Sequence, residues 1–302
     1  MLKNKNKVFA VVDILYLVMA ILPFLALIIL KILTDVPSEG ISVTGAKVFF
    51  TITMPLQDFP VTESQFNSLA VVISIFFLCL YFTHGLSERA DLKRQHIAEW
   101  IIEKVDGLVK ENMGEYFKGY TPFIISILGL SAFSSLSSLL GLYPPTSDLN
   151  VVAGWAILVF ILITYYKLKC GFWNYLKGFT EPTPVLTPIN IIGEFATPVS
   201  MAFRHYGNVL SGTVVSVLVM SALGGLSNML LGWLPGILSG IPLFKIGIPA
   251  VLSIYFDAFS GCLQAFIFAM LTMLNISTSF PLEEYELRKQ AKKDKKENKI
   301  KI

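Results

Sequence analysis

The sequence predicts an all-α integral membrane protein with about four ordinary transmembrane helices and a long, steeply tilted C-terminal helical hairpin. Three observations favour this fold class: 54% of the 302 residues are hydrophobic, only 15% are charged, and the mean hydropathy is +0.65. A soluble domain carries about 25% charged residues, so the composition excludes a water-soluble globule. The net charge of +3 is too small for the positive field that nucleic-acid binding requires, and we expect no nucleic-acid partner.

Four uncharged runs account for the ordinary crossings, because a hydrocarbon core of about 30 Å requires about 20 apolar residues per helix. The first run covers 14–30 and the second covers 64–83. Two more lie within 121–166, where the only charged residue, Asp148, stands in a Pro-rich turn that separates them. Three lysines precede the first run as in a signal peptide, but no clean small-residue cleavage site follows it. We therefore expect a retained anchor.

The stretch 182–282 predicts the tilted hairpin. Its only charged residues are Glu194, Arg204, Lys245 and Asp257. Loop signals near 233–242 divide it into segments near 189–232 and 243–277. A helix of about 35 residues is about 52 Å long, well beyond the hydrocarbon thickness. Such helices must either break or tilt steeply. Gly224-Gly225 offers one place for a break, but a steep tilt is the more economical arrangement.

Basic residues predict the orientation, since cytoplasmic loops retain an excess of Lys and Arg. Twenty of the 24 basic residues fall on one side: in the first seven residues, in 84–120, in 167–177 and in 283–302. Six passages then place both termini in the cytoplasm. The loop 84–120 also predicts an amphipathic helix on the cytoplasmic surface, from apolar residues at helical spacing. These are Ile97, Trp100, Ile101, Val105 and Leu108.

Arg204 is the charge that most needs an explanation. Insertion scales place an arginine at a helix centre at about +2.5 to 3.5 kcal/mol, and its guanidinium cannot shed a proton, so it requires a partner or water. Glu194 precedes it by about 15 Å of helix, which is too far for a salt bridge. An arginine at the membrane edge that reaches headgroups is the alternative, but long uncharged stretches flank Arg204 on both sides. Arg204 therefore marks a functional site.

Helical spacing predicts two polar stripes in the hairpin. Arg204, Asn208 and Ser211 share one face of the first segment, where small residues leave room for another helix, although such residues serve packing within the chain equally well. In the second segment, Asp257 and Gln264 are seven residues apart and could line a wet path. The structural alternative is that Asp257 caps a helix or pairs with Lys245 across a bend.

Three separated motifs carry a resemblance to a known family. They are Pro188-Ile-Asn-Ile-Ile-Gly-Glu194 followed by Pro198-Val-Ser-Met-Ala-Phe-Arg204-His-Tyr-Gly-Asn208, then Leu263-Gln-Ala-Phe-Ile-Phe-Ala-Met-Leu-Thr272, and the earlier turn Pro144-Pro-Thr-Ser-Asp-Leu-Asn150. In this order and spacing they resemble subunit a of the F-type ATP synthases. The resemblance divides the chain into an N-terminal anchor and external loop (1–63), a subunit a core (64–278) and a basic cytoplasmic tail (279–302).

The resemblance implies a non-catalytic, ion-translocating stator in the bacterial plasma membrane, with two aqueous half-channels and an essential arginine that faces a ring of c subunits. Ion flow, here H⁺, would couple to rotation and ATP synthesis. The implied partners are the c-ring, the peripheral stalk subunit b, the remaining ATP synthase subunits and membrane lipid. No cofactor or metal is implied. The basic tail has no role by analogy, and its charge run is typical of a solvated helix.

The resemblance also assigns residues. Arg204 matches the essential arginine, Asn208 and Gln264 match positions that flank it, and Glu194 matches a position that lines one half-channel. Thr213 stands where some members carry a channel carboxylate and Asp257 where others carry His or Glu, so the acidic function would fall to Asp257. His205 replaces an apolar residue of the motif and either titrates in the channel or packs. Further possible channel-lining residues are Ser211, Thr213, His205 and Asp148.

Three other interpretations stay open. The same stator could couple to Na⁺, since the ion-binding carboxylate would belong to the ring. A stand-alone secondary transporter, with Arg204 holding an anionic substrate, is opposed by the absence of evident internal repeats. An intramembrane enzyme is opposed because Asp257 has no acidic partner at close spacing. The distant Cys79, Cys170 and Cys262 predict neither a disulfide framework nor a metal site, and the histidines share no ligand spacing.

Overall fold

Long apolar helices make up most of the structure. The computed structural model describes residues 2–34, 45–55, 58–86, 93–169, 171–180, 183–231, 247–282, 285–286 and 290. Within these ranges, six segments are long and apolar enough to cross a membrane: Phe9–Thr34, Glu63–Thr83, Glu115–Leu140, Leu149–Lys169, Pro184–Leu230 and Val251–Thr278. The chain is an all-α integral membrane protein, and the predicted fold class is confirmed.

The elements follow one another as predicted, with additions in the loops. The α-helices are α1 (Leu2–Thr34), α2 (Glu63–Thr83), α3 (Lys93–Met113), α4 (Thr121–Leu136), α5 (Leu149–Lys169), α6 (Phe172–Thr180), α7 (Thr187–Leu231), α8 (Ile248–Ser253) and α9 (Gly261–Thr278). Short 3₁₀ turns are η1 (Glu115–Tyr120), η2 (Ser137–Leu140), η3 (Pro145–Ser147) and η4 (Pro184–Leu186), and η7 (Ile254–Ser260) is a π-helix. Strands β1 (Val48–Ile52) and β2 (Phe59–Thr62) complete the set.

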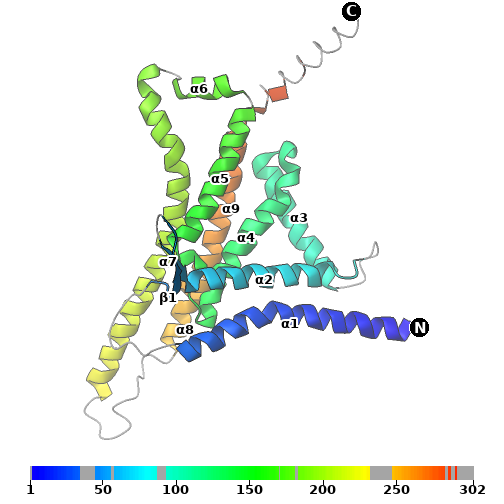
Figure 1. Ribbon diagram of the computed structural model, residues 1–302, viewed down its shortest axis with the longest axis vertical. Helices are drawn as coiled ribbons and strands as arrows, with labels where there is room; N and C mark the ends of the chain where they lie inside the picture. Colours follow the sequence, from blue (N-terminus) through cyan, green and yellow to red (C-terminus); the bar gives the residue numbers. More distant parts are fainter. Residues whose placement is uncertain are drawn as a thin grey trace, which may run out of the picture.

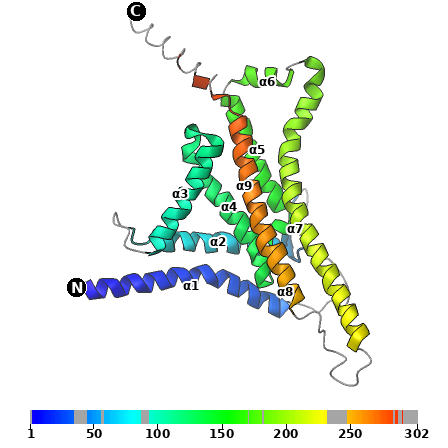
Figure 2. The same cartoon turned by 180° about the vertical axis from the view of Figure 1, so that it is seen from behind.

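The helices run in two directions. In Figure 1, α1 and α2 lie side by side, whereas α5, α7 and α9 run at a steep angle to them. Figure 2 shows α9 from behind, with α4 on one side of it and α7 on the other. Side chains from α3, α4, α5 and α9 form the main core, whose members include Val109, Ile124, Val159 and Phe268. Helices α3, α4, α5 and α9 are therefore held together by a core of their own, to which the described residues of α1 and α2 contribute no buried residue.

The helix α7 is continuous over 45 residues, about 68 Å at the usual helical rise. A break at Gly224-Gly225, one of the two predicted alternatives, is wrong because both glycines lie within the helix. The other alternative, a steeply tilted hairpin, stays a prediction, because its tilt is defined relative to a membrane. A single glycine pair costs about 1 kcal/mol per residue in a helix, which is too little to break one of this length.

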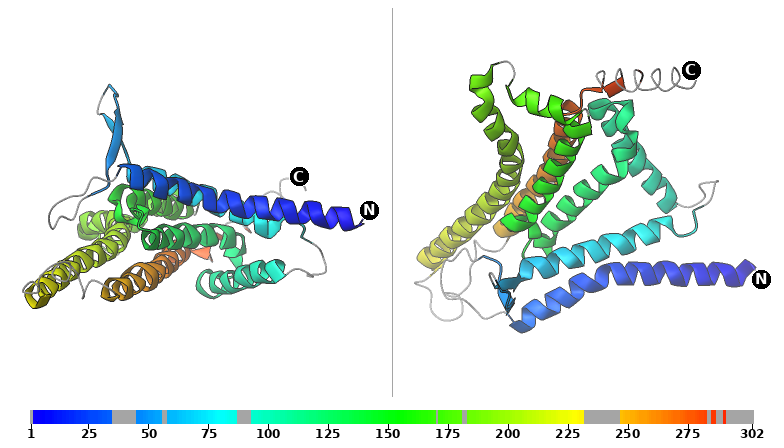
Figure 3. Two further views of the ribbon diagram at one scale, coloured as in Figure 1. Left: turned by 90° about the horizontal axis from the view of Figure 1, so that it is seen from below. Right: turned by 45° about the horizontal axis from the view of Figure 1, so that its top comes forward.

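A small β-hairpin was not predicted. Strands β1 and β2 pair antiparallel, with Phe50 opposite Val61 and Ile52 opposite Phe59. Figure 3 shows the hairpin projecting away from the helices. The aromatic and β-branched residues of β1 favour a strand, but the run is short and apolar periodicity alone does not distinguish it from a loop.

Helix α3 is amphipathic as predicted, but its apolar residues face two directions. Val105, Val109 and Met113 are buried in the main core. Ile97 and Trp100 are exposed, with 59% of Trp100 accessible. Exposed tryptophan is common where a helix meets a membrane interface, so the outer face of α3 suits contact with lipid or another subunit.

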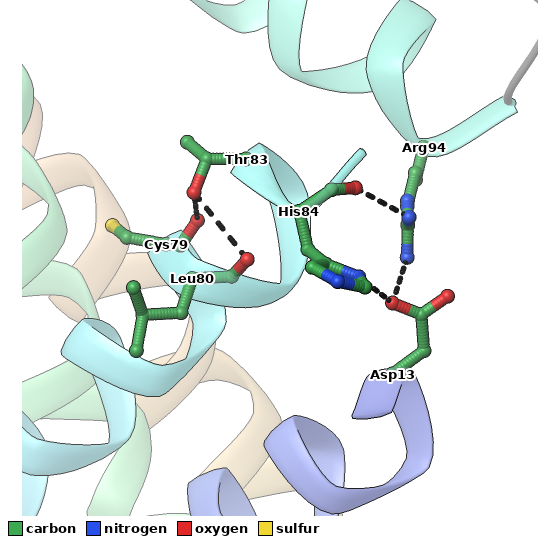
Figure 4. Close-up of polar contacts among 6 residues, drawn as sticks. All are labelled: Asp13, Cys79, Leu80, Thr83, His84 and Arg94. Atoms are coloured by element: carbon green, nitrogen blue, oxygen red, sulfur yellow. Dashed lines mark hydrogen bonds and ion pairs between the residues drawn. The ribbon is translucent and has the colours of Figure 1, made fainter. Parts of the chain in front are cut away.

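Polar contacts at two places fix α1 to the rest of the chain. Near its start, Asp13 Oδ1 pairs with His84 Nδ1 at 2.8 Å and with the guanidinium of Arg94, which also donates to the His84 carbonyl (Figure 4). Near its end, Lys31 donates to the carbonyl oxygen of Gly141. These contacts join α1 to the end of α2, the start of α3 and the turn after α4.

Helices α4 and α9 approach closely at Gly261. A Cβ added there would lie 2.6 Å from the Cβ of Ser135, so Gly261→Ala is expected to destabilise the chain by about 1–3 kcal/mol through overpacking. The midpoint of thermal unfolding in the purified assembly measures the effect. Gly129→Ala is the matched control, because open space surrounds that glycine on α4. Adding Ser135→Gly should restore the midpoint, and an unchanged midpoint in Gly261→Ala alone would contradict the close approach.

Candidate functional site

Arg204 lies on the outer face of α7. The predicted stripe of Arg204, Asn208 and Ser211 is exposed along its whole length, as is Val215, which continues the same face. The opposite face of the same turn, with Ala202 and His205, is buried against the other helices. Only 6% of the most apolar window of α7 is buried within the chain, against 44% for the segment that contains α9. The outer face of α7 is thus left uncovered by the part of the chain that the structure describes.

Arg204 forms no ion pair with any described residue. Glu194, which sequence spacing places too far away, pairs with Lys167 instead. A guanidinium on an apolar helix of membrane-spanning length therefore presents its charge outward without a counter-charge from the described chain. Its partner must be water or a group on another molecule.

The two amides predicted to flank Arg204 contact each other. Asn208 Nδ2 donates to Gln264 Oε1 at 2.6 Å and joins α7 to α9 one turn beyond Arg204. Gln264 is only 3% exposed, so this hydrogen bond satisfies a buried amide oxygen. The bond fixes the register of the two hairpin helices near the arginine.

Asp257 lies in the π-helix η7 and is half-buried. Its carboxylate has side-chain hydrogen bonds with Ser138 of η2 and Ser253. Beside it is a cavity of about 10 Å³, which is close to the space that one water molecule requires. The alternative pairing with Lys245 lies outside the described residues. Single π-helical turns are frequent at functional sites because they re-aim side chains.

Glu194 occupies a second polar region at the other end of the hairpin. It lines a cavity of about 680 Å³ between α5, α6, α7 and the end of α9. Lys167 Nζ lies 2.5 Å from Glu194 Oε2, and Tyr175 of α6 is hydrogen-bonded to the same carboxylate. Figure 1 shows α6 bridging the diverging ends of α5 and α7.

The remaining predicted residues have local contacts. His205 is fully buried, with Nε2 at 3.4 Å from Ser131 Oγ and its ring against Trp155 and Phe268, so it packs inward and away from the exposed stripe. Thr213 donates to the Val209 carbonyl of its own helix. Asp148 Oδ1 accepts from the Asn150 backbone N–H at 3.0 Å, which places it at the start of α5 as a turn-forming residue.

Sequence reasoning missed three groups that line these sites: the α4 serines, Lys167 and Tyr175. Ser131, Ser135 and Ser138 recur at helical spacing, a pattern that could have predicted a polar face on α4 and η2. This face contacts His205 at one end and Asp257 at the other. Sequence reasoning used Lys167 only to predict the orientation of the chain in the membrane, because its partner Glu194 lies 27 residues away.

The comparisons with known proteins point to one family. The family described as "ATP synthase A chain" matches residues 66–277. The chain is 30% identical over 274 residues to "ATP synthase subunit a, sodium ion specific" of Propionigenium modestum, covering 80% of this chain and 88% of that protein. It is 31% identical over 230 residues to "ATP synthase subunit a" of Anoxybacillus flavithermus, covering 72% and 92%. The same description applies to a Priestia megaterium protein at 33% identity over 230 residues, with 72% and 92% covered.

Proposed function

This chain belongs to the ATP synthase A chain family, and from that membership we propose that it is the stator that guides ions past a rotating c-ring. As a family member it is a multi-pass membrane subunit that takes part in ion transport within the ATP synthase complex. The finer proposal is that H⁺ enters and leaves through two half-channels and that Arg204 separates them. The catalytic conversion of ATP then belongs to other subunits.

The observation that carries the proposal is the outward position of Arg204 on α7, where no residue that the structure describes forms an ion pair with it. A ring carboxylate can move through lipid only when its bound ion neutralises it, because a bare charge in hydrocarbon is costly. When the carboxylate reaches the fixed guanidinium, the ionised form is favoured and the ion is released. A carboxylate held by Arg204 also blocks direct passage of ions between the half-channels.

The two polar regions of the hairpin support the two half-channels. The cavity at Glu194 lies near Lys167, Lys169 and Lys177, so the excess of basic residues assigns it to the cytoplasmic side. Asp257 lies toward the opposite end of the hairpin and would exchange ions with the external side. The membrane potential contributes about 2.3 kcal/mol per charge per 100 mV, which makes rotation between the one-sided channels directional.

We propose H⁺ as the coupling ion. The cavity of about 10 Å³ beside Asp257 has room for about one water molecule, which is compatible with a proton relay. The Propionigenium modestum relative is described as sodium ion specific, so the test measures the transport of both H⁺ and Na⁺.

Family membership also supports proposals about the division of the chain, its orientation and its partners. We place residues 1–63 as an N-terminal anchor and external loop, 64–278 as the core and 279–302 as a cytoplasmic tail, with both termini in the cytoplasm of a bacterial cell. Apart from the c-ring, the proposed partners are the peripheral stalk subunit b, the other ATP synthase subunits and lipid. The uncovered face of α7 suits the ring.

Purification under mild detergent, followed by reconstitution into vesicles, tests the function. We expect the chain to co-purify with a ring of small subunits and a stalk, and ATP to acidify the vesicle lumen in a protonophore-sensitive manner without added Na⁺. If ATP instead drives ²²Na⁺ uptake and a protonophore stimulates that uptake, the coupling ion is Na⁺ and not H⁺. Isolation of the chain with neither ring nor stalk would overturn the stator function and favour a stand-alone transporter.

A further inference from the structure

The pair of Lys167 and Glu194 is the only charged pair among the described residues that line the 680 Å³ cavity. Lys167 comes from the last turn of α5 and is 28% exposed, whereas Glu194 is on α7 and is 10% exposed. The 2.5 Å separation of Nζ and Oε2 makes a direct, charge-assisted hydrogen bond. The carboxylate that the family resemblance assigns to ion passage is thus occupied by a cation of its own chain.

The other described residues that line the cavity are uncharged. Helix α6 contributes Tyr175, and α9 with the residues after it contributes Asn275, Thr278 and Ser279. Burial and the nearby Glu194 carboxylate raise the pKa of Tyr175 above its ordinary value of 10, so the phenol keeps its proton and donates it in the hydrogen bond. The other carboxylate oxygen, Glu194 Oε1, is buried without a hydrogen-bond partner in the described part of the chain.

We propose that Lys167 is a specificity-determining residue of the cytoplasmic half-channel: its tethered ammonium fills the cation position at Glu194 and prevents transported cations from lodging there. The proposal rests on the proposed function and assigns a role to a residue outside the family motifs. Because the pair is neutral overall, the cavity offers water and neutral hydroxyl and amide groups to a passing ion rather than a trap. Ions then cross the cavity without being held at Glu194.

The physical reason lies in what an unpaired carboxylate would do. Removing one member of a largely buried ion pair leaves a charge that burial disfavours, and such a group recovers by binding a proton or another cation. Without the ammonium, Glu194 would therefore become a titrating cation site in the path of the ions. A pair that only ties α5 to α7 would not have this consequence.

Three variants of the whole complex in vesicles separate these roles: Lys167→Gln, Lys167→Arg and the double change Lys167→Gln with Glu194→Gln. The rate of ATP-driven proton pumping is measured against the pH of the ATP-facing side, with and without Na⁺. For Lys167→Gln we expect a new titration of about threefold or more in rate between about pH 6 and 9, and slowing by Na⁺ at the alkaline end. Lys167→Arg should follow the unmodified complex, and the double variant, whatever its overall rate, should show neither the new titration nor the slowing by Na⁺.

Two outcomes would overturn the role of Lys167. One is a Lys167→Gln profile that matches the unmodified complex at every pH and Na⁺ concentration. The other is a double variant that keeps the new titration and the slowing by Na⁺, since that response would then not come from an unpaired Glu194. The proposed function fails separately, if the unmodified complex does not pump or if Arg204→Lys pumps as well as it does.

Discussion

Replacement of Arg204 by lysine is expected to abolish coupled ion transport while leaving the complex assembled. A lysine retains one positive charge only if it stays protonated, and burial against an apolar surface lowers the pKa of an ammonium, so it can become neutral. Arginine stays charged and offers five donors in a planar fork. Because Arg204 is exposed on α7, replacing it by the shorter lysine side chain disturbs no packing within the chain.

The measurement is ATP-driven acidification of vesicles that contain the reconstituted complex, together with ATP synthesis driven by an imposed proton gradient. Both should fall to the background of vesicles without the complex. Val215→Ala is the matched control, because Val215 lies on the same exposed face and carries no charge. Full pumping in Arg204→Lys would contradict the essential role of the guanidinium.

Replacement of Asp257 by asparagine is expected to lower the rate of coupled transport about tenfold or more, since positioned proton carriers contribute about 10²–10⁴ in proton transfer. The amide has nearly the same shape, so the hydrogen bonds with Ser138 and Ser253 can persist in altered polarity. What is lost is a group that can take up and release a proton beside the water-sized cavity.

Initial rates of proton-driven ATP synthesis measure this effect, normalised to the amount of chain in each preparation. Asp106→Asn provides a matched control, because it removes a carboxylate of α3 that pairs with Lys110 and accepts a hydrogen bond from Thr121, outside the two polar regions of the hairpin. Near-normal synthesis in Asp257→Asn would assign the external half-channel to other residues.

The sequence anticipated the features that depend on one helix at a time. Uncharged length predicted the crossings, and helical spacing predicted that Arg204, Asn208 and Ser211 share a face, which is the exposed face of α7. Asn208 and Gln264, which the resemblance assigns to positions that flank the arginine, contact each other, and their role stays a proposal.

The features that escaped prediction depend on contacts between distant helices. Ser138 reaches Asp257 across more than a hundred residues, and Lys167 reaches Glu194 across the unpredicted helix α6. Periodicity tells which face a residue occupies but not which helix covers that face. His205 illustrates the same limit, because one step along the helix from Arg204 turns its side chain into the core.

Cysteine cross-linking tests most directly the central claim that the Arg204 face of α7 meets the ring. The background replaces Cys79, Cys170 and Cys262 by serine, since Cys79 and Cys262 are exposed. Single cysteines are then placed at Phe203 and Ser211 on the exposed face and at Ala202 on the buried face, opposite cysteines along the outer helix of the ring subunit. The account predicts disulfide products with the ring from Phe203→Cys and Ser211→Cys and none from Ala202→Cys. Products from Ala202→Cys alone, or labelling of both exposed positions by lipid-soluble reagents with no ring product, would contradict it.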